Sequence, residues 1–213
     1  MTRKEHFNKK IKPWAYDLYE HRYLLLISLG FLIFAAILDF STGTYVSHVN
    51  TVSAPDLILD NIPSFDDLAF IFTYVYLAVL FIFFLYPALF DTKKLHVTIS
   101  QFSLLVAVRA IFVTFTHLSP PSGAIPVTFP WFFGRFLFDN ALFFSGHVAI
   151  PFLGFLLFRG KKISYFFLAA SVVMGATVLL IHIHYSIDVF AAFFITYGTF
   201  EIGERLFKRI NHH

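Results

Sequence analysis

Long apolar stretches alternate with short polar segments along most of this chain. A helix needs about 20 mostly apolar residues to cross a hydrocarbon core of roughly 30 Å. The stretches near that length are Tyr23–Phe40, Leu68–Phe90, Leu95–Phe115, Ala141–Phe158, Ile163–Ile181 and His184–Phe207. Polar residues interrupt the last stretch at both ends, so its apolar core is expected at Ile187–Tyr197. The pattern predicts an all-α fold, a polytopic membrane protein built as a bundle of six transmembrane helices.

The composition also indicates that the solvent is a bilayer. Of the 213 residues, 58% are hydrophobic and 14% are charged, which leaves few polar side chains to cover a soluble domain. The chain has no cysteine, which excludes disulfides, thiolate metal sites and a cysteine nucleophile. The formal net charge of +3 is too small to indicate nucleic-acid binding, so no nucleic-acid partner is expected.

The positions of Lys and Arg orient the predicted bundle, because cytoplasmic flanks retain positive charge during membrane insertion. Of the 16 basic residues, all except Arg109 and Arg135 fall on one side of a six-crossing bundle. The loop at 41–67, on the other side, contains several Asp residues and no Lys or Arg. We therefore expect both termini to be cytoplasmic.

The polar flanks and the apolar centre predict one membrane domain. We expect residues 1–22 to form a basic N-terminal segment, residues 23–207 the six-helix domain, and residues 208–213 a cytoplasmic tail. The aromatic run 131–133 is typical of an interfacial segment at headgroup depth. The compact chain without extensions favours a bacterial inner membrane.

Ionisable side chains inside or at the ends of spanning helices are energetically unfavourable, so they are candidates for functional residues. Arg109, His147, His182, His184 and Asp188 are of this kind. The predicted topology, which was derived without these residues, places all of them on the non-cytoplasmic side. This agreement predicts that they form one site.

A histidine and an acid near the start of the last predicted helix are suited to nucleophilic catalysis. His184 and Asp188 are four residues apart, so they share a face of one helix. The carboxylate can accept the proton of one imidazole nitrogen and leave the other nitrogen with a free lone pair. His184 is therefore the candidate nucleophile, and His147 is the candidate proton donor to the leaving oxygen.

Phosphate is the group that the remaining candidates are suited to bind. Ser145 and Gly146 stand at the start of the fourth predicted helix, where unpaired N–H groups and the helix dipole favour an anion. Glycine lets the backbone approach a ligand closely. The Arg109 guanidinium can clamp a phosphate between the two histidines. The combination predicts phosphoryl transfer.

Each of these residues also has a structural explanation. A His–Asp pair can cap a helix at the membrane interface, and Arg109 can extend toward the interface. A transporter would also place Arg, His and Asp within the membrane. That alternative predicts polar residues through the cytoplasmic half, where the fourth and fifth predicted helices are almost wholly apolar. A catalytically silent lipid-binding protein is a further alternative.

Three motifs together resemble the type 2 phosphatidic acid phosphatase superfamily, and more closely its sphingomyelin-synthase-like branch. Phe144-Ser145-Gly146-His147 is similar to the Ser-Gly-His motif of that branch. His184-Tyr185-Ser186-Ile187-Asp188-Val189 is similar to its His-Tyr-Thr-x-Asp-Val motif. Arg109, followed by Leu118-Ser119-Pro120-Pro121, resembles the Arg-containing motif of its third helix. The resemblance covers roughly residues 68–207.

The resemblance implies a six-helix fold with an outward-facing His-His-Asp site and a covalent phosphohistidine intermediate. By position, His184 is the nucleophile, Asp188 orients it, His147 is the general acid and then base, and Arg109 binds phosphate. No metal or cofactor is expected. The implied substrate is a phospholipid from the bilayer.

Two acceptors remain open for the phosphoryl intermediate. Water would make the chain a lipid phosphatase, whereas the hydroxyl of ceramide or diacylglycerol would make it a headgroup transferase. Hydrolysis is slightly favoured because it requires no second lipid site. The stretch Phe138-Asp139-Asn140-Ala141 departs from the Cys-Gly-Asp of the sphingomyelin-synthase branch, so the headgroup is left open. The sequence does not indicate an oligomeric state.

Overall fold

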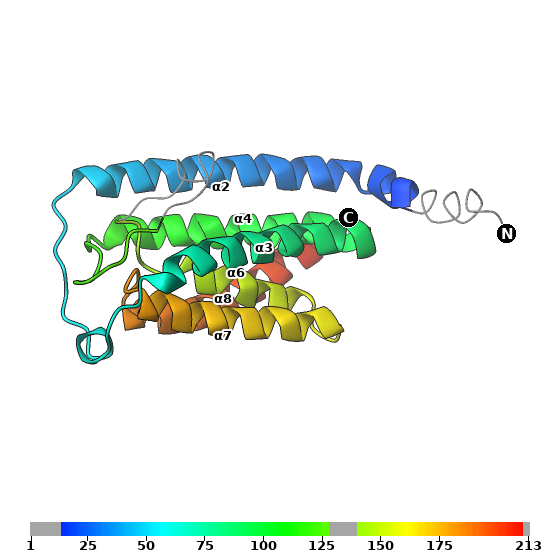
Figure 1. Cartoon of the computed structure of the whole chain (residues 1–213). Coiled ribbons are helices and arrows are strands. Elements are labelled where there is room, and N and C mark those ends of the chain that lie inside the picture. Colours follow the sequence, from blue (N-terminus) through cyan, green and yellow to red (C-terminus); the bar gives the residue numbers. More distant parts are fainter. Residues whose placement is uncertain (1–13, 128–139, 211–213) are drawn as a thin grey trace.

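A computed structural model describes residues 14–127 and 140–210 of the chain, whose helices pack lengthwise as a bundle (Figure 1). The helices are α2 (Arg22–His48), α3 (Asp67–Phe90), α4 (Thr92–Phe115), α6 (Gly146–Leu157), α7 (Lys162–Leu180) and α8 (Ser186–Ile210), with a 3-10 turn, η1, at Leu59–Asn61. No strand occurs in these two ranges, so the all-α prediction is confirmed. The predicted interfacial segment at 131–133 lies outside the described residues.

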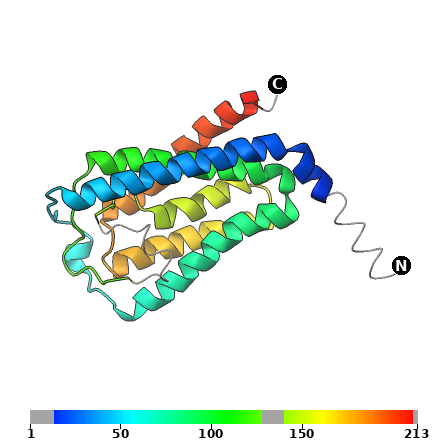
Figure 2. The same ribbon diagram turned by 90° about the horizontal axis from the view of Figure 1, so that it is seen from above.

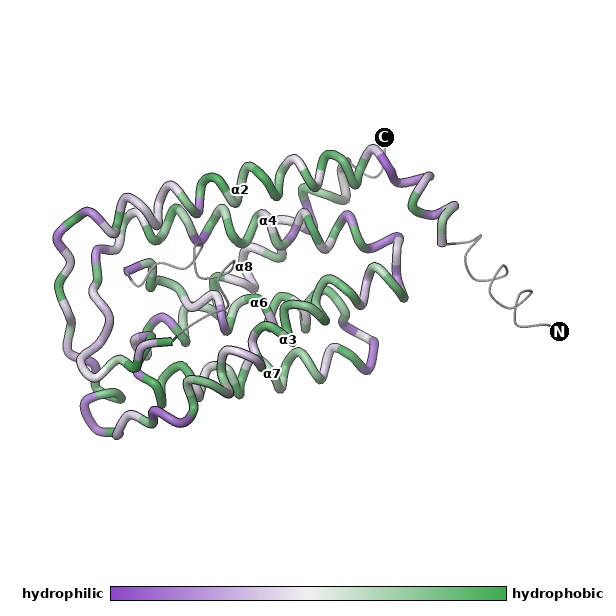
Figure 3. The backbone as a smooth tube through the Cα atoms, turned by 45° about the horizontal axis from the view of Figure 1, so that its top comes forward, coloured by the Kyte–Doolittle hydropathy of each residue, from purple (hydrophilic) through white to green (hydrophobic). Residues whose placement is uncertain are grey.

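Several of the helices fit a membrane. By length and composition, α2, α3, α4 and α7 are long and apolar enough to cross one. Hydrophobic residues occupy most of their middle turns, and hydrophilic residues concentrate toward the ends (Figure 3). The apolar helix α6 has 12 residues, which corresponds to about 18 Å of helix. Four candidate spans are therefore established, and six crossings remain a prediction.

Consecutive helices run in opposite directions, so the starts of α3, α6 and α8 lie at the same end of the bundle (Figure 1). We call this the loop-rich end, because the connections 49–66 and 116–127 also lie there. The central helix α6 contacts α3, α4, α7 and α8, whereas α2 packs along α4 on the outside. The C-terminal part of α8 extends beyond the other helices (Figure 2).

A close approach holds α6 against α7. A Cβ atom added to Gly154 of α6 would lie 2.8 Å from the Phe167 ring of α7. Any larger side chain at this position would push the two helices apart, which is why small residues favour tight packing in membrane bundles. The Phe167 ring also stacks on Phe158, at the end of α6. These contacts fix the axial position of α6 and hence the position of its first turn.

Polar contacts connect the two turns at the opposite end of the bundle. Asp91, between α3 and α4, forms an ion pair with Lys161, between α6 and α7. The indole Nε1 of Trp14 donates a hydrogen bond to the Ala88 carbonyl oxygen at 2.7 Å. The N-terminal segment is thereby attached to the end of α3.

Two helices begin later than the sequence pattern predicts. The fourth span was expected from Ala141, but α6 begins at Gly146. The carbonyl oxygens of Ala141 and Phe144 accept hydrogen bonds from Arg109 instead of taking part in a continuing helix. The last span was expected from His184, but α8 begins at Ser186. His184 therefore lies in the turn before the helix, and the prediction that it shares a helix with Asp188 is wrong in that detail.

The first helix is longer than predicted. Its apolar run was expected to end at Phe40, whereas α2 continues to His48. The hydroxyls of Ser41, Thr44 and Ser47 each donate to the carbonyl four residues earlier, so this polar stretch satisfies its side chains within the helix. The extension carries α2 past the loop-rich ends of its neighbours.

Candidate active site

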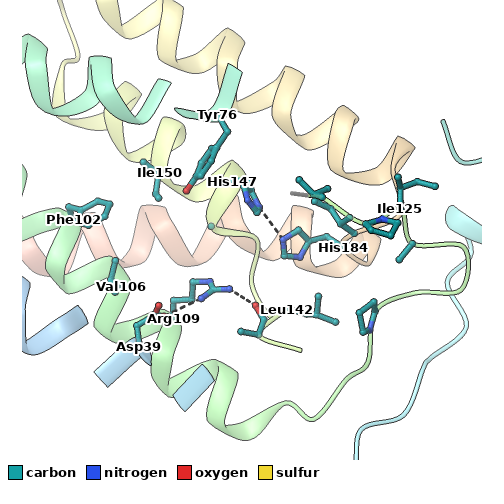
Figure 4. Close-up of a pocket in the computed structure, with 17 residues that line it drawn as sticks. Asp39, Tyr76, Phe102, Val106, Arg109, Ile125, Leu142, His147, Ile150 and His184 are labelled. Carbon is teal, nitrogen blue, oxygen red and sulfur yellow. Dashed lines mark hydrogen bonds and ion pairs between the residues drawn. The ribbon is translucent and has the colours of Figure 1, made fainter. Parts of the chain in front are cut away.

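Three of the predicted residues, His147, His184 and Asp188, are linked by hydrogen bonds at the loop-rich end, and Figure 4 shows the two histidines. His184 Nδ1 lies 3.2 Å from Asp188 Oδ2, and His184 Nε2 lies 3.4 Å from His147 Nδ1. An ionised carboxylate can only accept a hydrogen bond, so His184 Nδ1 carries a proton and donates a hydrogen bond to Asp188. His184 Nε2 then carries the lone pair that a nucleophile requires.

Asp188 joins the starts of two helices. Its Oδ2 also accepts the Tyr185 N–H at 3.0 Å, so the carboxylate caps the turn that presents His184. Its carbonyl oxygen accepts the Ser145 N–H at 3.2 Å, which ties α8 to the residue before α6. Asp188 is fully buried. The distance between the two histidines is thus set by contacts of one acidic residue.

His147 occupies the first turn of α6 and faces both His184 and an aromatic wall. Its ring centroid lies 4.5 Å from that of Tyr76 and 4.9 Å from that of Phe72, both in α3. The two imidazoles touch in this arrangement. A phosphoryl group can therefore reach His184 Nε2 only when the two rings move apart.

A cavity of about 650 Å³ opens beside the two histidines. Most of its lining is apolar and includes Phe102, Val106 and Ile150. Among the residues that the structure describes, the ionisable or hydroxyl-bearing ones that line it are Asp39, Tyr76, Arg109, His147 and His184. An apolar pocket with a few convergent polar groups is typical of a ligand site. Its chemistry suits a molecule with an anionic group attached to a hydrocarbon body.

Arg109 reaches this cavity from α4 and is held by three acceptors. Its Nε donates to the Phe144 carbonyl oxygen at 3.2 Å, and Nη2 donates to the Ala141 carbonyl oxygen. Its Nη1 donates to Asp39 Oδ1 at 3.2 Å (Figure 4). A guanidinium has five N–H groups, so two remain for a ligand.

The two other predicted phosphate ligands are placed differently from each other. Gly146 lines the cavity, and a Cβ atom there would lie 3.5 Å from Arg109 Nε. Ser145 is fully buried and is not among the residues that line the cavity. Its hydroxyl has no hydrogen-bond partner within the described ranges. The structure thus brings Gly146 to the cavity with Arg109, and it places Ser145 behind the cavity wall.

His182, another ionisable candidate from the sequence, lies outside the cavity. It is buried, with a φ of 54°, and its Nδ1 lies 3.2 Å from the Ser122 carbonyl oxygen. A left-handed conformation is uncommon for a residue other than glycine. Its contact holds the 116–127 connection against the turn between α7 and α8, so the structure gives it a part in joining these two segments.

Asp39 is a charged residue of the cavity that the sequence analysis missed. It is a carboxylate in α2 that follows an apolar run beginning at Tyr23, and its side chain is 26% exposed. The rule that draws attention to ionisable residues within spanning helices applies to it as well. Applied to the first helix, that rule would have found Asp39.

The outer connection between α2 and α3 is clamped onto the turn that carries His184. Asp56 Oδ2 accepts the Ser186 N–H at 2.7 Å, and Oδ1 accepts the N–H groups of Ile58 and Leu59 at 2.9 and 3.2 Å. Burial alone would raise the pKa of Asp56. The hydrogen bonds from Ser186, Leu59 and Ile58 outweigh it and hold the pKa below its usual 3.8.

Tyr185, the residue after His184, forms the second part of this clamp. Its hydroxyl donates to the Ser119 carbonyl oxygen at 2.9 Å and accepts the Ala54 N–H at 3.0 Å. Tyr185 is buried. The clamp formed by Asp56 and Tyr185 therefore joins the connections 49–66 and 116–127 to the turn that carries His184.

Replacing Asp56 tests this clamp. Asp56→Asn should destabilise the protein by about 1–3 kcal/mol at pH 7, because hydrogen bonds to a charged acceptor are lost. A lowered folded-state pKa contributes stability that is present above the unfolded value and is lost as the pH falls through the folded value. The loss on substitution should therefore shrink below pH 3.8. Thermal unfolding in detergent at pH 7 and at pH 3 measures both; an equal loss at both would contradict the role of the charge.

Comparison with family models, with curated proteins and with solved structures found no match to this chain. Among residues 14–127 and 140–210, no group of three or more His, Cys, Asp or Glu side chains is arranged to hold a metal ion.

Proposed function

We propose that this chain is an integral-membrane enzyme that attacks the phosphoester of a phospholipid through a phosphohistidine intermediate, with hydrolysis as the outcome. The observation that carries the proposal is the hydrogen-bonded series His147–His184–Asp188, which lies beside a cavity that Arg109 also lines. A nucleophile, its orienting acid, a second imidazole and a cation for phosphate lie together. The resemblance of the three motifs to the type 2 phosphatidic acid phosphatases supports the same chemistry.

In the first step, His184 Nε2 attacks phosphorus. The new P–N bond forms as the bond between phosphorus and the leaving oxygen breaks. His147, in its protonated form, gives a proton to that oxygen. Asp188 stabilises the positive charge that develops on His184, because its carboxylate accepts a hydrogen bond from the Nδ1–H group. Arg109 offsets negative charge on the phosphoryl oxygens.

In the second step, the neutral His147 removes a proton from water as the water oxygen attacks the phosphohistidine. The P–N bond breaks, and its electron pair returns to His184 Nε2. The enzyme regains its starting protonation state, with His147 protonated and His184 neutral. One pair of histidines thus serves both half-reactions, as microscopic reversibility requires for similar leaving and attacking groups.

Headgroup transfer to a lipid hydroxyl is the second candidate. It uses the same residues, because an alcohol can replace water in the second step. The Ser-Gly-His and His-Tyr-Ser-x-Asp-Val motifs, which resemble the sphingomyelin-synthase branch, favour it. Hydrolysis needs no second lipid in the cavity, and we retain it as the main proposal.

A transporter would use the same ionisable residues as part of a path across the bundle. Gln101 of α4 is a buried polar side chain that could extend such a path away from Arg109. It is fully buried, it donates to the Phe200 carbonyl oxygen of α8 at 3.2 Å, and it is not among the cavity-lining residues. This use of Gln101 to join two helices favours an enzyme over a transporter.

Incubating the purified protein with a panel of phospholipids, with and without ceramide or diacylglycerol, tests the proposed function. Release of phosphate or of a phosphorylated headgroup in water alone is the expected result. Formation of a new phospholipid only when an acceptor lipid is present would replace hydrolysis by transfer. No turnover of any lipid in the panel would contradict the proposal.

The proposed orientation places the loop-rich end outside the cytoplasm, in a membrane that we propose to be the bacterial inner membrane. The chain has no cysteine, so single cysteines can be labelled without background. A membrane-impermeant thiol reagent should label Ser122→Cys in intact cells and Lys162→Cys only after the membrane is opened. Both residues are exposed. Labelling of both from the same side would contradict six crossings and the orientation.

A further inference from the structure

The cavity contains a carboxylate directly beside its cation. Asp39 Oδ1 lies 3.2 Å from Arg109 Nη1, and the two side chains are 26% and 20% exposed. Both line the cavity with His147 and His184. A carboxylate in the otherwise apolar α2 is unfavourable unless it is paired. The pair joins α2 to α4, but that joint does not require the carboxylate to reach the cavity.

The charges of Arg109 and Asp39 explain how the position of Asp39 affects the binding of an anion. Arg109 alone would give the empty cavity a positive charge and a high affinity for any anion. Asp39 neutralises that charge, and an entering phosphate must then bind beside a carboxylate. A carboxylate and a phosphate several ångströms apart in a partly buried site repel each other, and water in the cavity screens part of this repulsion. The carboxylate therefore lowers phosphate affinity.

The geometry of Arg109 explains why Asp39, of its three hydrogen-bond acceptors, is the one that can move away. The other two acceptors are backbone carbonyls of Ala141 and Phe144, which lie in the segment that leads into α6. Moving them would move the start of α6 and His147 with it. The Asp39 side chain can leave Arg109 by a rotation about its own bonds. Its departure would free a third N–H group for the phosphate.

We propose that Asp39 is a positioning residue that holds Arg109 in the empty cavity and competes with phosphate for it, so that phosphate is bound weakly and released readily. The proposal rests on the proposed role of Arg109 as the phosphate ligand. It assigns to α2 a part in phosphate binding that no sequence motif indicated. Removing the charge of Asp39 should tighten phosphate binding, whereas removing an ordinary structural ion pair would not.

Phosphate binding can be measured without turnover. The probe is inorganic phosphate, titrated at constant ionic strength while the thermal unfolding of the full chain in detergent is followed, because a ligand that binds the folded state raises the midpoint. Asp39→Asn keeps an oxygen that can accept from Arg109 Nη1. Its phosphate dissociation constant should be about 10-fold lower than that of the wild type. The same curves show whether each variant is folded.

Three further variants make the test specific. Asp39→Thr, whose hydroxyl can bond to its own helix as Thr44 does, should also tighten phosphate binding and serves if Asp39→Asn does not fold. Asp39→Glu keeps the charge and should stay within twofold of the wild type. Asp67→Asn removes an exposed charge at the same end of the bundle and should also stay within twofold.

The outcomes separate this proposal from the proposed function. Unchanged or weaker phosphate binding in folded Asp39→Asn or Asp39→Thr would overturn the role of Asp39, even if the wild type turns over phospholipids. Tighter binding in these variants, with no turnover of any lipid by the wild type, would support Asp39 as the competitor and contradict the enzymatic proposal instead.

Discussion

Replacing His184 by Ala should lower phospholipid turnover by at least about 10⁴-fold, because the substitution removes the only atom proposed to bond to phosphorus. The fold should persist. His184 contributes a ring to the cavity wall, and the Tyr185 N–H can still bond to Asp188. The measurement is the initial rate of product release from the best lipid in the panel, with thermal unfolding as the check on folding.

His117→Ala is the matched control for this substitution. His117 follows α4 at the loop-rich end, is exposed, and bonds through Nε2 to the Thr114 carbonyl oxygen. Its replacement removes one imidazole from the same end without touching the cavity, so turnover should stay within about threefold. If His184→Ala turns over phospholipid as fast as His117→Ala does, His184 is not the nucleophile.

Replacing His147 by Ala should have the second largest effect, and it should depend on the leaving group. With a lipid alcohol as leaving group, turnover should fall by about 10²–10⁴-fold, the usual contribution of a positioned general acid or base. The nitrophenolate of a nitrophenyl phosphoester leaves without a proton. With this substrate, His147→Ala should therefore form the phosphoenzyme at close to the wild-type rate. Breakdown of the phosphoenzyme should remain slow, because the base that activates water is absent.

Rapid mixing of His147→Ala with a nitrophenyl phosphoester separates these steps. We expect a burst of nitrophenolate that approaches one equivalent per enzyme, followed by slow turnover. Equal losses for the lipid and the nitrophenyl ester, without a burst, would contradict the assignment of His147 as acid and base. Such a result would instead indicate that His147 holds His184 in place.

Sequence patterns predicted most of the helices, and they predicted that His147, His184 and Arg109 lie together, because much of this information is local. Apolar runs of helical length mark α2, α3, α4 and α7, and polar breaks such as Asp91 separate them. The His184–Asp188 contact follows from a spacing of four residues. Such spacing leaves two side chains on the same side of the chain even where the first residue precedes the helix.

Non-local contacts account for what the sequence did not predict. Asp39 and Arg109 are 70 residues apart, and Asp56 and Ser186 are 130 apart, so no spacing rule connects them. The late start of α6 has the same origin, because the carbonyl oxygens that Arg109 binds belong to a distant segment. The pattern of apolar residues continues through Ala141 to Phe144 and contains no sign of that interaction.

Phosphoryl transfer to His184 is tested most directly by identifying the residue that carries phosphate. His147→Ala, mixed with its substrate and stopped in alkali to preserve phosphohistidine, can be digested and mapped by mass spectrometry. We expect phosphate on the peptide that contains His184, and no phosphate on that peptide in the double variant His147→Ala/His184→Ala. Phosphate on another residue, or turnover with an unmodified His184, would contradict it.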